Sequence, residues 1–182
     1  LSPRDRKHGA EGAGKCKTEA EQQAYNQLYR RQLTEVLSRY GRMVEVWFDG
    51  SNIIEVGDIL KQYAPDAMIF QGPYATIRWV GNEEGHAPYP AWNAVPEIVW
   101  RECRATAEHG DPDGTVWLPN ECDARMRRDW FWNTKNAVTL KSLDQLMDMY
   151  YRSVGHGATL LLNHTPDRSG LIPEADVRRG AE

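Results

Sequence analysis

Runs of β-forming residues alternate with amphipathic segments along this chain, and that order restricts the fold to an α/β architecture. The predicted strands lie at 43–49, 67–70, 76–80 and 158–162. The predicted helices lie at 19–40, 56–63 and 142–154, and a short last helix starts near Pro173. A complete (β/α)8 barrel needs about 250 residues, whereas this sequence has 182. We therefore expect one α/β domain over 1–182 that is smaller than a complete barrel.

The first predicted strand carries an acidic residue at its carboxyl end. Val44, Val46 and Phe48 alternate with more polar positions and would face the covering helices. Trp47 and Asp49 would then lie on the opposite face, with Asp49 at the edge where α/β folds place their chemistry. From the pattern alone, a carboxylate that caps the next segment is an equally good interpretation of Asp49.

Two later segments give further expectations about the fold. The strand at 158–162 is apolar on both faces, which is typical of a parallel strand covered on both sides. Residues 84–136 are predicted to be irregular, because prolines and tryptophans are scattered through them without periodicity. Long loops rich in aromatic residues usually serve a site. Ser142 and Gln145 have the spacing of a capping box at the start of a helix.

Composition argues against several classes of function. The chain has 22 basic and 26 acidic residues, a net charge of −4, and so no surplus of positive charge for nucleic acid or anionic lipid. No apolar stretch approaches the ~20 residues of a membrane span, and we expect a soluble chain without a signal segment. The 3 cysteines form no C-x-x-C pair and the 5 histidines lack helical metal-ligand spacing, so neither metal nor cofactor is expected. The compartment is not indicated.

Acidic residues just after predicted strands are the strongest chemical signal. Glu83 follows the strand at 76–80 and Glu121 lies in an aromatic segment further on. Two converging carboxylates among aromatic rings are what glycoside hydrolysis requires, because one protonates the leaving oxygen and the other attacks the sugar or activates water. The structural alternative is that each acid forms an ion pair with a nearby arginine: Arg78, Arg101 or Arg125.

Several motifs in a consistent order resemble those of the α-L-fucosidases of glycoside hydrolase family 29. They are the segments at 1–6 (LSPRDR), 40–50 (YGRMVEVWFDG), 78–83 (RWVGNE), 117–123 (WLPNECD), 150–155 (YYRSVG), and 160–172 (LLLNHTPDRSGLI). Together these segments span nearly the whole chain, so chance is a poor explanation of the match.

The resemblance implies a retaining mechanism. Asp49 is then the nucleophile that forms a fucosyl-enzyme, and Glu83 is the general acid/base, with their carboxyl groups ~5 to 5.5 Å apart. The form of the motif at 78–83 is similar to the branch of the family that prefers α-1,3- and α-1,4-linked fucose. The substrate implied is a fucosylated oligosaccharide or glycoconjugate.

The same resemblance suggests substrate-binding residues. Trp47 and Trp79 would form the walls of the site and offer apolar surface to the methyl group of fucose. Arg78 and Glu121 would bind sugar hydroxyls, and Trp117 would be a further contact.

The chain also departs from the family. It has no tandem histidine pair, which the family carries in the first half of its barrel to help hold fucose. We therefore expect half of a (β/α)8 barrel, about four β/α units of a truncated catalytic domain. Because half a barrel leaves sheet edges open, we expect a homo-oligomer that covers them. The alternative is a catalytically weak or inactive half-barrel that acts as a fucose-binding, glycan-binding or folding module.

Overall fold

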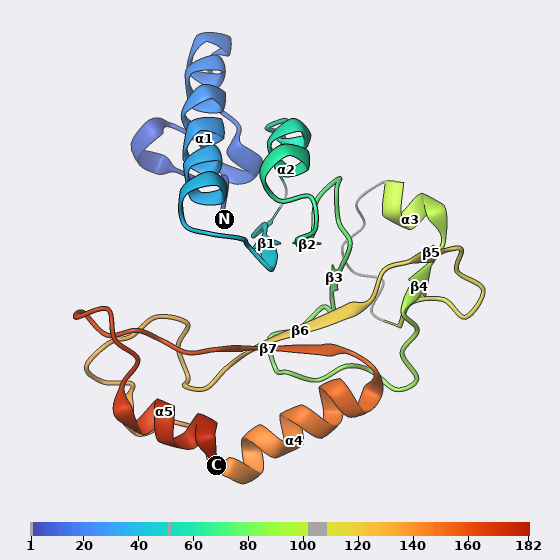
Figure 1. Cartoon of the computed structure of the whole chain (residues 1–182), viewed down its shortest axis with the longest axis vertical. Helices are drawn as coiled ribbons and strands as arrows, with labels where there is room; N and C mark the ends of the chain where they lie inside the picture. Colours follow the sequence, from blue (N-terminus) through green and yellow to red (C-terminus); the bar gives the residue numbers. More distant parts are fainter. Residues whose placement is uncertain (1, 51, 102–108) are drawn as a thin grey trace. The chain divides into compact units, whose positions relative to one another are not determined.

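The computed structural model describes residues 2–50, 52–101 and 109–182 (Figure 1). Their contacts divide them into two compact units. The first holds the described residues up to Ile77 together with the backbone at Trp100 and Arg101, and the second holds 78–99 and 109–182. Each unit is described by itself.

The first unit contains two short 3-10 helices, two α-helices and two strands. In chain order they are η1 (Arg6–His8), η2 (Gly12–Gly14), α1 (Glu19–Arg39), β1 (Glu45–Trp47), α2 (Gly57–Tyr63) and β2 (Met68–Phe70). β1 and β2 pair in parallel, with Val46 opposite Ile69. The predicted α/β order of this part is confirmed, with strands shorter than expected.

Helix α1 begins and packs as its sequence predicts. Thr18 accepts a hydrogen bond from the backbone N–H of Glu21 at 3.3 Å, and the Glu21 carboxylate accepts one from the Thr18 N–H at 3.0 Å. This capping box satisfies backbone donors that the first turn leaves without helical partners. The buried face follows the 3.6-residue period and consists of Tyr25, Tyr29, Leu33 and Leu37.

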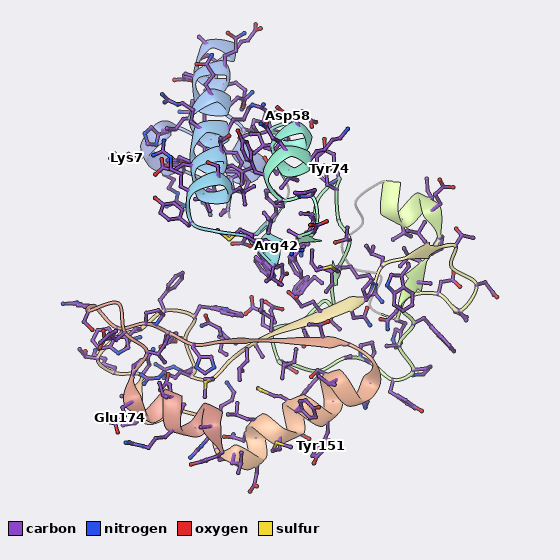
Figure 2. All side chains as sticks on the ribbon, viewed as in Figure 1. Lys7, Arg42, Asp58, Tyr74, Tyr151 and Glu174 are labelled. Carbon is purple, nitrogen blue, oxygen red and sulfur yellow. The ribbon has the colours of Figure 1, made fainter. Side chains whose placement is uncertain are left out.

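Side chains of α1, of α2 and of the loops flanking α2 hold this unit together. The Arg30 guanidinium donates to both carboxylate oxygens of Asp58, at 2.9 and 2.6 Å. Tyr74 lies beside α2 and donates to Glu55 (Figure 2). A Cβ on Gly57 would lie 2.5 Å from the Tyr74 ring, so the start of α2 requires glycine for this close approach.

The predicted facing of strand β1 is correct in part. Val46 and Phe48 are buried in the core with α1 and α2, as expected. The expectation for Val44 is wrong, because this residue precedes β1 and is 82% exposed. Its carbonyl still accepts a hydrogen bond from Met68 N–H at 2.9 Å, so the backbone pairing extends beyond the part of the strand whose side chains are buried.

The second unit is built on a parallel sheet in the order β3-β6-β7. Its elements are β3 (Arg78–Trp79), β4 (Ala94–Val95), the first three residues of α3 (Glu97–Arg101), β5 (Val116–Trp117), β6 (Asn120–Arg125), η3 (Ala137–Thr139), α4 (Leu143–Ser153), η4 (Val154–His156), β7 (Thr159–Asn163) and α5 (Glu174–Ala181). β4 and β5 form a separate antiparallel pair. Among the described residues the sheets are open and no barrel closes.

The central strand β6 was not predicted, and the expectation of an irregular 84–136 is wrong there. Its sequence, NECDAR, shows no alternation of apolar and polar residues. Cys122 and Ala124 on one face nevertheless lie in the core. Glu121 and Asp123 on the other face are buried as well, at 1% and 3% exposure. The strand is therefore buried on both faces although half of its residues have charged side chains.

Strand β7 corrects another expectation. Leu160 and Leu162 pack toward the core below the sheet, but Leu161 is 38% exposed and Thr159 is exposed too. The expected covering of both faces is wrong for this chain. In the part of the chain that the structure describes, β7 is an edge strand that pairs only with β6.

Helix α4 covers one face of this sheet (Figure 1). Its predicted capping box is confirmed, since the Ser142 hydroxyl accepts from the Gln145 N–H at 3.2 Å and the Gln145 side chain accepts from the Ser142 N–H at 2.9 Å. Leu146 and Met149 pack against Ala124 from β6. Periodicity and caps were enough to predict this helix, because both are local properties of the sequence.

A buried ion pair joins α5 to the chain that follows β6. The Arg127 guanidinium donates to Asp176 at 2.6 Å from Nη2 and 3.0 Å from Nε, and to the Asn136 side-chain oxygen at 3.1 Å. The side chains of Arg127 and Asp176 are 3% and 0% exposed. The removal of either charge would leave the other buried without compensation.

We expect Asp176→Ala to lower the free energy of unfolding by about 3 to 5 kcal/mol, because Arg127 would remain as an unpaired buried cation. Urea unfolding of the whole chain measures this. The control is Glu174→Ala, which breaks an exposed pair with Arg178 in the same helix and should cost less than about 1 kcal/mol. Equal losses in the two variants would contradict the prediction.

Candidate active site

Glu83 lies beyond the carboxyl end of β3 and contacts the chain that continues from β6. Its carboxylate Oε2 accepts a hydrogen bond from the Trp130 indole N–H at 3.0 Å. The same oxygen lies 3.7 Å from the Arg125 guanidinium, and the Glu83 side chain is 48% exposed. The ion pair that sequence analysis kept as the structural alternative for Glu83 is therefore present. These contacts hold the carboxylate at an accessible edge of the sheet.

The carboxyl ends of all three parallel strands contribute to this edge. Arg125, the last residue of β6, lies with its guanidinium carbon 5.2 Å from the centre of the Trp130 ring. Asn163, the last residue of β7, donates to the Trp130 carbonyl at 2.9 Å. A cation over an indole face is attracted by the ring quadrupole. Trp130 is therefore held by Arg125 at its ring face, by Glu83 at its N–H and by Asn163 at its carbonyl.

Trp79 makes a second contact between an indole and a carboxylate. Its N–H donates to Asp123 Oδ1 at 2.6 Å. Burial raises the pKa of Asp123, and the negative charge of Glu83 adds to that rise, while the Trp79 hydrogen bond and the Arg125 charge oppose it. Asp123 is 3% exposed, so this bond satisfies a carboxylate that would be costly to bury alone.

The structure places Arg78 on the opposite face of the sheet from Trp79. In the register of β3 and β6, Arg78 pairs with Asn120 and Trp79 pairs with Glu121, and successive residues of a strand point to opposite faces. The Arg78 guanidinium is buried and donates to the carbonyls of Leu118 and Trp92 at 3.0 and 2.8 Å. Burial lowers the pKa of Arg78 to about 10.

The other two substrate contacts predicted in this unit lie apart from each other. Glu121 shares the face of Trp79 and is 1% exposed. Trp117 belongs to β5, pairs with Ala94 and is 71% exposed. Because β5 leads into the amino end of β6, Trp117 lies toward the opposite end of the strand from Arg125. The structure therefore brings Trp79 close to the surroundings of Glu83 but separates Trp117 from them.

Asp49 and Trp47 belong to the first unit. β1 ends at Trp47, whose ring stacks on Phe70 with centroids 4.1 Å apart and planes 8° apart. Asp49 is exposed beyond the carboxyl end of that strand and is followed by Gly50, which has a φ of 84°. The structure describes Asp49 and Glu83 within different units, so the distance between their carboxyl groups stays a prediction.

Three residues near Glu83 were not predicted as parts of a site: Asp123, Arg125 and Trp130. The sequence predicts Arg125 only as an ion-pair partner, and Trp130 is only one of several tryptophans in a long loop. Asp123 lies in the motif at 117–123 and ends it. Its place as an acidic residue within a motif that resembles the family was the signal that could have identified Asp123 as part of a site. The Arg101 side chain lies outside the described residues.

Within the described ranges, no group of three or more histidine, cysteine, aspartate or glutamate side chains is arranged to hold a metal ion. None of the described helices is long and apolar enough to cross a membrane.

A family model described as alpha-L-fucosidase matches residues 6–181. The chain belongs to the α-L-fucosidase family. This match confirms the resemblance found in the motifs. The chain is also 35% identical over 167 residues to "Alpha-L-fucosidase 1" of Arabidopsis thaliana. This alignment covers 85% of the chain and 33% of the plant protein.

Solved structures of family 29 fucosidases are similar to the chain as well. A Ruminococcus gnavus GH29 fucosidase in complex with fucose aligns with a TM-score of 0.74 and 34% identity, over 91% of this chain and 38% of that one. A glycoside hydrolase 29 family member from an unknown rumen bacterium aligns with a TM-score of 0.80 and 32% identity, over 99% of this chain and 35% of that one. The chain spans about a third of the length of the curated relatives it matches, 33% of one and 32% of another.

The raised pKa of Asp123 predicts how stability changes with pH. Between the ordinary value of 3.8 and the raised value, the native state keeps a proton that the unfolded state has lost. The free energy of unfolding therefore falls as pH rises through this window. Asp123→Asn removes the titration, so the variant should become more stable relative to the wild type as pH rises toward neutral. Denaturant unfolding across this range measures the difference, and parallel pH curves would contradict the prediction.

Proposed function

We propose that this chain supplies the catalytic pair of a retaining α-L-fucosidase, with Asp49 as nucleophile and Glu83 as general acid/base. The observation that supports it most is the setting of Glu83: an accessible carboxylate at the carboxyl edge of a parallel sheet, held by the Trp130 indole and by Arg125. Family membership adds to this support. The proposed substrate is a fucosylated oligosaccharide or glycoconjugate with terminal α-1,3- or α-1,4-linked fucose.

The proposed reaction has two steps. In the first, an Asp49 oxygen bonds to the anomeric carbon of fucose while the bond to the leaving oxygen breaks and Glu83 gives that oxygen its proton. In the second, Glu83 takes a proton from water, the water oxygen attacks the same carbon, and the bond to Asp49 breaks. Two inversions release fucose with its original configuration. Retention requires the carboxyl groups ~5 to 5.5 Å apart.

The walls of the proposed site are aromatic. Trp47 and Trp79 would offer apolar surface to the methyl group and the C–H face of fucose. The stack of Trp47 on Phe70 and the bond of Trp79 to Asp123 fix both rings within their own units, which supports such a role. Substrate binding by Arg78, Glu121 and Trp117 stays a prediction.

For the fold, we propose half of a (β/α)8 barrel with about four β/α units, completed by another copy of the chain. The support is strand β7, which pairs only with β6 among the described strands and so has one unpaired edge. Its Thr159 and Leu161 side chains are also exposed. Apolar surface left in water costs ~25 cal/mol per Å2, and an open edge invites pairing.

The second candidate function is a catalytically weak or inactive half-barrel that binds fucose or a glycan, or serves as a folding module. The Glu83–Arg125 ion pair favours this alternative. Fucose binding at equilibrium without turnover would support it over the catalytic proposal.

Asp49→Ala and Glu83→Ala test the catalytic proposal with an aryl α-L-fucoside as substrate. Loss of the acid/base should lower kcat by about 10²- to 10⁴-fold, and loss of the nucleophile by at least about as much, because no fucosyl-enzyme can form. Glu174→Ala removes an exposed carboxylate on α5 and should leave the rate unchanged. Unchanged hydrolysis in the Asp49 variant would end the assignment.

The assembly proposal predicts that activity elutes with an oligomer. Light scattering on size-exclusion fractions gives the mass of each species, and the same fractions are assayed with the aryl fucoside. If copies complete the barrel, the specific activity should rise with concentration as monomers associate. A monomer that is fully active at micromolar concentration would refute this part of the proposal.

A further inference from the structure

Asp123 is a buried carboxylate that the proposed reaction does not use. It lies on the central strand β6, and Leu161 of β7 is opposite it in the register. On the other side of β6, Trp79 of β3 is opposite Glu121. Because Asp123 pairs with Leu161 of β7, its backbone is held by the sheet, and its 3% exposed side chain has little freedom.

The Trp79 indole leans along the sheet to reach Asp123. Trp79 pairs with Glu121, yet its N–H donates two residues further along β6, to Asp123 Oδ1 at 2.6 Å. The ring is thus directed toward the carboxyl end of the strand, where Arg125 and Glu83 meet. Trp79 is also the last residue of β3, which pairs with β6 through only two residues. Because so short a strand gives its last residue little backbone support, the orientation of the Trp79 ring depends on its side-chain contacts.

Charged groups of both signs act on Asp123. On β6 the Arg125 side chain faces the same side as Asp123 and attracts its charge, and from the chain after β3 Glu83 repels it. Opposite it on β7, Leu161 carries no charge. A hydrogen bond to an ionised acceptor is shorter and stronger than one to a neutral group, so a carboxylate fixes the indole more firmly than an amide or hydroxyl would.

We propose that Asp123 is a positioning residue that fixes the plane of the Trp79 indole, so that its face can pack against the sugar held next to Glu83. This inference rests on the proposed function, because it takes fucose as the ligand. Asp123 acts only through Trp79 and touches neither the sugar nor the reacting atoms.

The first test measures the indole itself and needs no activity. In a ¹⁵N spectrum of the whole chain, Trp79→Phe identifies the Trp79 indole N–H signal by its disappearance. Asp123→Leu, which has a side chain of similar size but no acceptor, should shift that signal and speed its exchange with solvent by at least about ten-fold. Asp123→Asn, which keeps an oxygen acceptor, should shift the signal less. An unmoved Trp79 signal in Asp123→Leu would overturn the proposal.

The second test measures equilibrium binding of L-fucose. Asp123→Leu should raise Kd by roughly ten-fold, whereas Asp123→Asn should stay within about two-fold of the wild type. In a Trp79→Phe background, Asp123→Leu should change Kd by less than about two-fold, because the phenyl ring has no N–H for Asp123 to bind. An equal loss in both backgrounds would show that Asp123 acts by another route and would overturn the proposal.

The outcomes separate this inference from the proposed function. If the wild-type chain neither binds L-fucose nor hydrolyses the aryl fucoside, the proposed function fails and the inference fails with it. If the wild type binds fucose and Asp123→Leu binds it equally well, the inference alone fails. Thermal unfolding checks that each variant is folded. Should Asp123→Leu not fold, Asp123→Asn decides: an unchanged Trp79 indole signal in that variant overturns the proposal.

Discussion

The backbone pairing of β6 on both sides is the constraint on which the second unit depends. β3 and β7 run parallel to it, so the carboxyl ends of three strands meet at one edge. Glu83 extends past β3, Arg125 ends β6 and Asn163 ends β7. Their contacts through Trp130 exist because the strands are parallel and in register. A shift of one residue would turn Asp123 and Arg125 to the opposite face of the sheet.

Two buried charged side chains in β6 and the chain that follows it are stabilised by specific partners. The Trp79 indole satisfies Asp123, and further along the chain Asp176 and Asn136 satisfy Arg127. Without these partners, the burial of such groups would destabilise the fold by more than the apolar contacts of the strand stabilise it. The apolar residues Cys122 and Ala124 make the contacts of β6 with the core.

The parts of the fold that sequence analysis predicted well are those set by local interactions. Helices α1 and α4 begin at capping boxes and bury faces of regular period, and both match the expected ranges to within one or two residues. β6 was missed because its sequence has no strand periodicity. The exposure of Val44 and Leu161 differs from expectation because burial depends on what covers a strand, and the strand's own sequence does not contain that information.

By itself, the sequence predicted helices α1, α2, α4 and α5, the strands β1, β2, β3 and β7, the family, and the candidate pair of acids at 49 and 83. Only the tertiary structure decided that Glu83 contacts Trp130 and Arg125, that Asp123 holds Trp79, and that Arg78 lies on the opposite face. The contacts of Trp79 with Asp123 and of Trp130 with Glu83 join residues 44 and 47 positions apart. Such contacts depend on strand register and on the packing of loops against the sheet edge, and both arise only when distant segments of the chain come together.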